Sequence, residues 1–178
     1  VLSDVVSVLR NEIPSASTNI IEIATKQGQN AAYMNYTCSR SRELVDLSLR
    51  VLAAFAHLDW KGWPRVVRKE NVLAAAANTA LWEMTIQKTN LKISKSSKGA
   101  PVSGISARIL RYALIMIAHI LSMTETQELA MRMLAENANL NRMMARCARA
   151  AVEHGPAQVR IGAFVMKCVE KAARTHYY

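Results

Sequence analysis

The sequence predicts an all-α fold, and three observations support this class. Of the 178 residues, 51% are hydrophobic but only 6% are aromatic, so the core must consist mainly of Ala, Leu, Ile, Val and Met, which favours helices. Six Gly and four Pro are too few for the frequent turns of an all-β protein. Apolar residues also recur at helical spacing along most of the chain. We therefore expect one helical domain over residues 1–178.

The first predicted helices precede residue 58. Apolar residues recur every three or four positions over residues 2–13, and this helix should end at Pro14, which has no amide hydrogen to donate. A second helix is expected over residues 15–28, and residues 30–39 form either a short helix or an ordered loop. Over residues 41–57 apolar side chains occupy so many faces that we expect a central helix enclosed by its neighbours.

The middle of the chain contains a predicted loop. After the interruption at residues 59–64, apolar residues from Leu73 to Met84 return at helical spacing. Periodicity is then lost, and Lys, Ser and Gly replace the apolar residues up to Ser103. Long segments of this kind are usually functional or disordered. We predict a basic flexible loop over residues 88–103, joining halves at about 1–87 and 104–178.

The second half should contain four helices. The first is the most apolar, but its apolar run is shorter than the roughly 20 residues that cross a bilayer, so we interpret it as a buried central helix rather than a membrane span. Thr124, followed three residues later by Gln127, has the form of a capping box that begins the next helix. Residues 137–139 are expected to interrupt that helix, and the break at residues 154–156 separates the last two.

The last two predicted helices each carry a cationic stripe beside an apolar one. Their cations are Arg142, Arg146, Arg149, Arg160, Lys167, Lys171 and Arg174. Two packed helices can turn these residues outward together. Only Glu153 and Glu170 are nearby to neutralise them, whereas an ordinary soluble face mixes charges of both signs. The stripes are therefore candidate binding sites for phosphates or acidic protein segments; the alternative is an ordinary solvated face.

A second cluster interleaves aromatic and cationic residues. It consists of Trp60, Lys61, Trp63, Arg65, Arg68 and Lys69. This combination can stack bases and hold the backbone of single-stranded nucleic acids. The alternative, which we favour, is that the two indoles fill the edge of the core while a cation lies over a ring.

No set of residues suggests reaction chemistry. The histidines are not spaced as metal ligands on one helix, and the acids are scattered near helix ends and outer faces. Cys38, Cys147 and Cys168 are far apart, so we interpret them as buried thiols of a reducing compartment. We expect no catalytic residues, no cofactor and no metal site. The opening Val1-Leu2-Ser3-Asp4-Val5 lacks the features of a signal peptide, so we expect an intracellular protein, cytoplasmic or nuclear.

One stretch resembles a known helical repeat. Residues 155–166 contain a turn, the pair Val159-Arg160, a small residue and the apolar pair Phe164-Val165, in the order seen in the second helix of an armadillo or HEAT repeat. Residues 39–52 and 106–114 look similar. The resemblance implies a short α-solenoid that binds peptides or other proteins along one face, and it supplies no catalytic residues. Because the stretches are unevenly spaced, the sequence predicts an irregular multi-helix domain, with such a short solenoid as the alternative.

The net charge of +10 favours an anionic partner. We predict a non-enzymatic scaffold whose basic face receives an acidic or amphipathic segment of another protein. The alternative is a single-stranded RNA- or DNA-binding protein, viral nucleoprotein-like or chromatin-associated, that uses the same face together with the Lys-rich loop. A self-assembling structural role is a third possibility. The sequence does not predict the oligomeric state.

Overall fold

The protein is all-helical. The structure, a computed structural model, describes residues 2–12, 39–58, 61–96, 104–152 and 156–175. Every regular element within these ranges is an α-helix, which confirms the predicted fold class. The helices are α1 (Leu2–Glu12), α4 (Ser39–His57), α5 (Trp63–Lys69), α6 (Val72–Ser96), α7 (Gly104–Ser122), α8 (Thr124–Glu136), α9 (Ala138–Val152) and α10 (Pro156–Thr175). The helix predicted over residues 15–28 and the ambiguous segment 30–38 lie outside the described residues.

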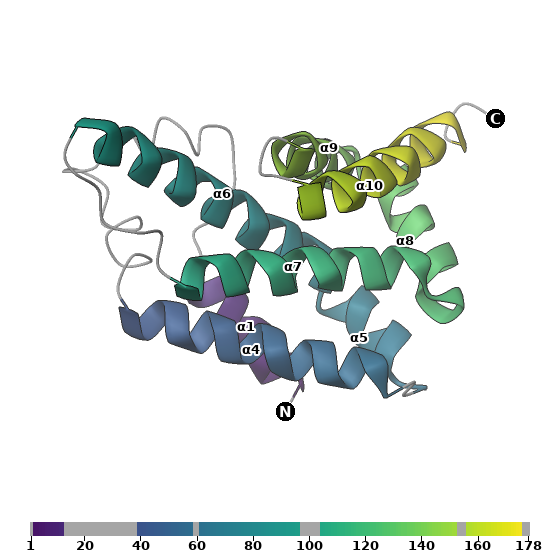
Figure 1. The fold of residues 1–178 in the computed structure, drawn as a ribbon. Coiled ribbons are helices and arrows are strands. Elements are labelled where there is room, and N and C mark those ends of the chain that lie inside the picture. Colours follow the sequence, from purple (N-terminus) through teal and green to yellow (C-terminus); the bar gives the residue numbers. More distant parts are fainter. Residues whose placement is uncertain (1, 13–38, 59–60, 97–103, 153–155, 176–178) are drawn as a thin grey trace.

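The α7 helix is the centre of the fold. It contacts α4 and α6 most extensively and also packs against α8 and α10. Figure 1 shows α7 between α4, with α1 behind it, and the α9–α10 pair. Its side chains Ile109, Ala113 and Ile117 are completely buried, as expected for a central helix. Among the described helices, α7 alone is long and apolar enough to cross a membrane. Half of the residues in its most apolar stretch are buried inside the molecule.

The α4 helix is not the enclosed helix that the sequence predicts. One side, with Leu49 and Leu52, is fully buried against α1 and α7, but Leu44, Leu47 and Val51 are exposed. The prediction was wrong because an apolar side chain favours burial without guaranteeing that a neighbouring element covers it. The apolar residues on several faces of α4 therefore reflect one packed face and one uncovered face.

The predicted loop over residues 88–103 is wrong in its first part. The α6 helix continues to Ser96, so residues 88–96 are helical, and residues 97–103 lie outside the described residues. The stretch from Gln87 to Ser96 contains Leu, Ile, Gln and Lys, which support a helix even where the apolar face ends. Loss of amphipathic periodicity therefore does not mark the end of this helix. The helices before and after residues 97–103, α6 and α7, pack against each other.

The short helices begin and end at recognisable residues. Trp63 and Pro64 start α5, inside the predicted interruption, because proline is well suited to the first turn. Asn71, with a φ of 48°, separates α5 from α6 in a backbone conformation that Asn tolerates. Asn137 ends α8, and its Oδ1 accepts hydrogen bonds from the amides of Asn139 and Leu140 to begin α9.

The predicted capping box at the start of α8 is wrong. Thr124 is the first helical residue, and the position before the helix is Met123, which makes no side-chain cap. The nearby threonine that acts at this corner is Thr126, whose buried hydroxyl donates to the carbonyl oxygen of Ile120 at 2.8 Å. This bond joins the start of α8 to the end of α7.

Candidate interaction surface

The α9 helix has a buried face and a cationic face. Its buried residues are Leu140, Met144, Cys147, Ala148 and Ala151. Arg142, Arg146 and Arg149 are exposed. Spacings of three and four residues place these arginines on one side of the helix, because such residues are neighbours on a helix surface. The buried face packs against α6, α8 and α10, so the arginines point away from the core.

The α10 helix repeats this arrangement. Val165, Cys168, Val169 and Ala172 are buried, against α7, α8 and α9. The exposed cations are Arg160, Lys167, Lys171 and Arg174. Together with Arg142, Arg146 and Arg149 they form what we call the cationic α9–α10 surface. Two regular helices hold the backbones of these side chains in fixed positions.

The α9 and α10 helices are antiparallel and in close contact. Near one end, the side-chain amide of Asn141 donates to the carbonyl oxygen of Val169 at 3.4 Å. Near the other, a Cβ atom at Gly162 would lie 2.7 Å from the carbonyl oxygen of Ala148 and 3.0 Å from a methyl group of Val152. This register places Arg142 level with Lys167 and Lys171. The two sets of cations therefore run alongside each other.

The cations of the α9–α10 surface have no acidic partner among the described residues, in contrast to Arg42 and Arg132. Elsewhere, Arg42 lies 2.9 Å from Glu83, and Arg132 lies 3.0 Å from Glu128. Within the part of the chain that the structure describes, no ion pair involves a cation of the α9–α10 surface. Unpaired cations on a rigid surface attract anionic partners, and added salt screens this attraction.

The second predicted cluster is only partly available for binding. Trp63 is 4% exposed, so a base could not stack on its ring, and the interpretation that this indole fills the core is correct. Trp60 lies outside the described residues. Lys61, Arg65, Arg68 and Lys69 are exposed, and Lys69 lies 3.7 Å from the carboxylate of Glu70. In Figure 1, α5 and the α9–α10 pair lie on opposite sides of α7, so the two cationic sets are not one site.

Two buried acidic groups hold helices together, and the sequence analysis missed both. Glu83 on α6 is completely buried and accepts hydrogen bonds from Arg42 on α4, at 2.9 Å, and from Ser106 on α7. Asp46 on α4, 4% exposed, lies 3.4 Å from Arg108 on α7. The expectation that the acids lie on outer faces is wrong here. For Glu83 a signal existed, because an acid inside the apolar stretch Leu81-Trp82-Glu83-Met84 needs a buried partner.

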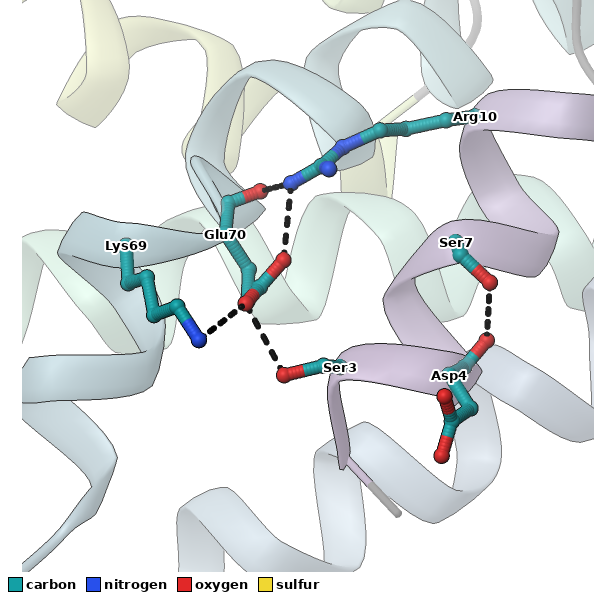
Figure 2. A network of polar contacts seen from close by, with 6 residues as sticks. All are labelled: Ser3, Asp4, Ser7, Arg10, Lys69 and Glu70. Atoms are coloured by element: carbon teal, nitrogen blue, oxygen red, sulfur yellow. Dashed lines mark hydrogen bonds and ion pairs between the residues drawn. The ribbon is translucent and has the colours of Figure 1, made fainter.

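A third buried acid, Glu70, attaches α1 to the corner between α5 and α6. Figure 2 shows its carboxylate between Ser3 and Lys69, with Arg10 reaching both the carboxylate, at 3.2 Å, and the Glu70 carbonyl oxygen. The hydroxyl of Ser3 donates to Glu70 at 2.9 Å. This hydrogen bond, assisted by the charges of Lys69 and Arg10 and opposed by desolvation, lowers the pKa of Glu70. The cluster stabilises an ionised carboxylate, which is a structural role.

The histidines at the ends of α4 and α7 meet in space, although their sequence positions gave no indication of this. The rings of His57 and His119 lie edge to face, with centroids 4.9 Å apart. Burial lowers the pKa of His119, as does His57, while Glu125 opposes the shift. Among the described residues no group of three or more His, Cys, Asp or Glu side chains could hold a metal ion.

The two cysteines within the described ranges are buried free thiols. Burial raises the pKa of Cys147 to about 12 and also raises the pKa of Cys168. Neither thiol is therefore activated as a nucleophile. Cys38 lies outside the described residues.

The geometry thus favours the cationic α9–α10 surface as the candidate site. Comparisons with protein-family models, with curated proteins and with solved structures gave no match to this chain.

Proposed function

We propose that this protein is a non-enzymatic interaction scaffold and that its cationic α9–α10 surface binds an acidic segment of another protein. The observation that carries the proposal is the set of exposed cations on two packed helices without an acidic partner among the described residues. The two helices fix the backbone positions from which these side chains extend. An acidic segment would therefore meet cations whose backbones are already ordered, which reduces the entropic cost of association.

Two further properties belong to this proposal. The resemblance of residues 155–166 to armadillo and HEAT repeats suggests a scaffold of stacked helix pairs, and the antiparallel packing of α9 on α10 supports it. An intracellular location, cytoplasmic or nuclear, is supported by the free thiols of Cys147 and Cys168.

The test measures binding of the full chain to a fluorescent poly-glutamate peptide. The wild type should bind, and binding should weaken as salt is added. The variant R142E/R146E/K167E/K171E should lose binding while keeping its helical circular dichroism spectrum, because exposed substitutions away from packing change stability by about 0.5 kcal/mol or less each.

The matched control places the same change in net charge elsewhere. K61E/R65E/R68E/R111E reverses four exposed cations on the α5 side of the molecule and on α7. This control should bind poly-glutamate within a few-fold of the wild type. Equal loss in both variants would mean that overall charge, rather than the cationic α9–α10 surface, governs binding, and the proposal would be wrong.

Single-stranded nucleic acid is the alternative partner of this surface. Exposed arginines and lysines also bind phosphates, and log affinity would then fall linearly with log salt at a slope of about 0.7 per phosphate neutralised. Burial of Trp63 removes one of the two aromatic rings expected to stack bases. A single-stranded oligonucleotide that binds the wild type more tightly than poly-glutamate would favour this alternative.

A further inference from the structure

Apolar side chains lie between the two sets of cations on α9 and α10. Val152, at the end of α9, is 46% exposed, and Val159, in the first turns of α10, is 37% exposed. Ala163 is exposed as well, and Met166 is half-buried. We call Val152, Val159, Ala163 and Met166 the valine strip. Aliphatic side chains that are exposed together beside cations make this strip a candidate binding surface.

The position of the strip follows from the helix geometry of α9. Asn141 and Val152 lie on the side of α9 that faces α10. At about 100° per residue, Arg142 and Arg149 lie roughly a quarter turn from that side, away from the core. Val152 therefore lies between the α9 arginines and α10.

The same geometry orders the outer side of α10. Gly162 and Val169 face α9. Val159 and Met166 lie about 40–60° from that side, whereas Lys167 lies about 140° away, on the outer edge. Because both helices bury their other side in the core, their exposed sides form one outer surface. Its order across the pair is arginines of α9, valine strip, cations of α10.

The strip is short and has a defined end. Val159 and Met166 are seven residues apart, so the strip is about 10 Å long at 1.5 Å per residue. Glu170, one turn further along α10, is exposed and would repel an acidic partner. A surface of this length matches about two turns of a helix. Cations on both sides match a helix whose apolar stripe has acids on both flanks.

We propose that the valine strip receives one acidic amphipathic helix of a partner protein, with its apolar residues on the strip and its carboxylates on the flanking cations. This inference rests on the proposed binding of an acidic partner to the cationic α9–α10 surface. Apolar residues at positions i, i+3 or i+4, and i+7 of the partner would fit this recognition mode. A nucleic acid whose phosphates bind the cations has no apolar stripe that matches the valines. Within the described part of α9 and α10, the aromatic ring on which a base could stack is that of Phe164, which is half-buried.

The test compares four probes: an amphipathic peptide of Leu and Glu with apolar residues at those spacings, a scrambled peptide of the same composition, poly-glutamate, and a single-stranded oligonucleotide. The wild type should bind the amphipathic peptide at least about tenfold more tightly than the scrambled one, because only the former can bury a continuous apolar stripe. The peptide should also gain helical circular dichroism when it binds.

The variants separate apolar from charged contributions. V159S, and V152S/V159S, should lose this preference while binding poly-glutamate as the wild type does. The matched control V51S changes a valine on α4 that is 38% exposed, against 37% for Val159, and should have no effect. The single variant V159S is included because Val152 lies next to Gly162, where a substitution could also disturb the packing of α9 on α10.

The outcomes distinguish the inference from the proposed function. The valine strip does not bind a partner helix if the wild type binds poly-glutamate without preferring the amphipathic peptide, or if V159S keeps the preference. In either case the scaffold proposal still stands. If the wild type binds neither acidic peptide, the proposed function itself fails. If the oligonucleotide binds more tightly than the amphipathic peptide and V159S leaves that binding unchanged, the surface serves nucleic acid and the inference is wrong.

Discussion

Gly162 is the residue on which the close approach of α9 and α10 depends. Its missing side chain leaves room for the backbone of Ala148, and a Cβ there would lie 2.7 Å from a carbonyl oxygen that cannot rotate away. The register of the pair, and with it the alignment of the two sets of cations, follows from this contact.

We expect Gly162→Ala to lower the free energy of unfolding by about 1–2 kcal/mol. A clash with a backbone oxygen should cost about 2–3 kcal/mol, the upper part of the range for overpacking, and better helix propensity returns about 1 kcal/mol. Urea denaturation measures the change. Gly104→Ala is the matched control, since a Cβ there meets nothing within 4 Å. Equal stability of Gly162→Ala and wild type would show that the two helices are not held this closely.

A second residue, His119, should make stability depend on pH. Burial and the neighbouring His57 lower its pKa below the ordinary value of 6.5, so the folded state favours the neutral ring. The stabilising contribution is therefore present above about pH 6.5 and is lost as pH falls through the lower folded-state pKa. In His119→Gln the thermal midpoint should fall less between pH 7 and pH 5 than in the wild type. Parallel curves would contradict this, as would an NMR titration of His119 with an unshifted pKa.

At the scale of single elements, α4 presents leucines in two environments on one helix. Leu49 is completely buried, whereas Leu47, two residues earlier, is 54% exposed. Sequence periodicity does not separate them, because both are apolar positions in a helix with apolar residues on several faces. The difference comes from α1 and α7, which cover only one side of α4.

We therefore expect Leu49→Ala to reduce the free energy of unfolding by about 2–5 kcal/mol through loss of buried contacts and formation of a cavity. Leu47→Ala should change it by about 0.5 kcal/mol or less. Denaturant unfolding of the two variants makes a matched comparison on the same helix. A large effect at Leu47 would mean that another element covers this face in solution.

At the scale of the whole molecule, the thiols of α9 and α10 report on how the helix pair opens. Cys147 is completely buried and Cys168 is 8% exposed, and burial raises the pKa of both. Only a thiolate attacks a disulfide reagent, so both thiols should be protected in the folded state.

In a Cys38→Ser variant, Ellman's reagent at neutral pH should therefore react slowly with the native protein and fully after denaturation. Cys168 should react before Cys147. Reaction of both thiols together, faster than global unfolding, would show that the α9–α10 pair opens as one unit. Immediate reaction of both thiols in the native protein would contradict the packing of this pair.

The sequence alone determines the properties that are local to a helix. Composition and periodicity predict the all-α class, and the outward placement of Arg142 and Lys167 follows from spacing because apolar and charged residues separate on a single helix. The break at Asn137 is also local, since Asn satisfies the first amides of the next helix with its own side chain.

Only the tertiary structure decides which helices meet. It places α7 rather than α4 at the centre, pairs Glu83 with Arg42 across a long stretch of sequence, and brings His57 to His119. The valine strip likewise exists only because α9 and α10 pack antiparallel at Gly162. The physical reason is that the hydrophobic effect is non-directional. It favours the removal of any apolar side chain from water, and the shape of the assembled helices determines which side chains are buried.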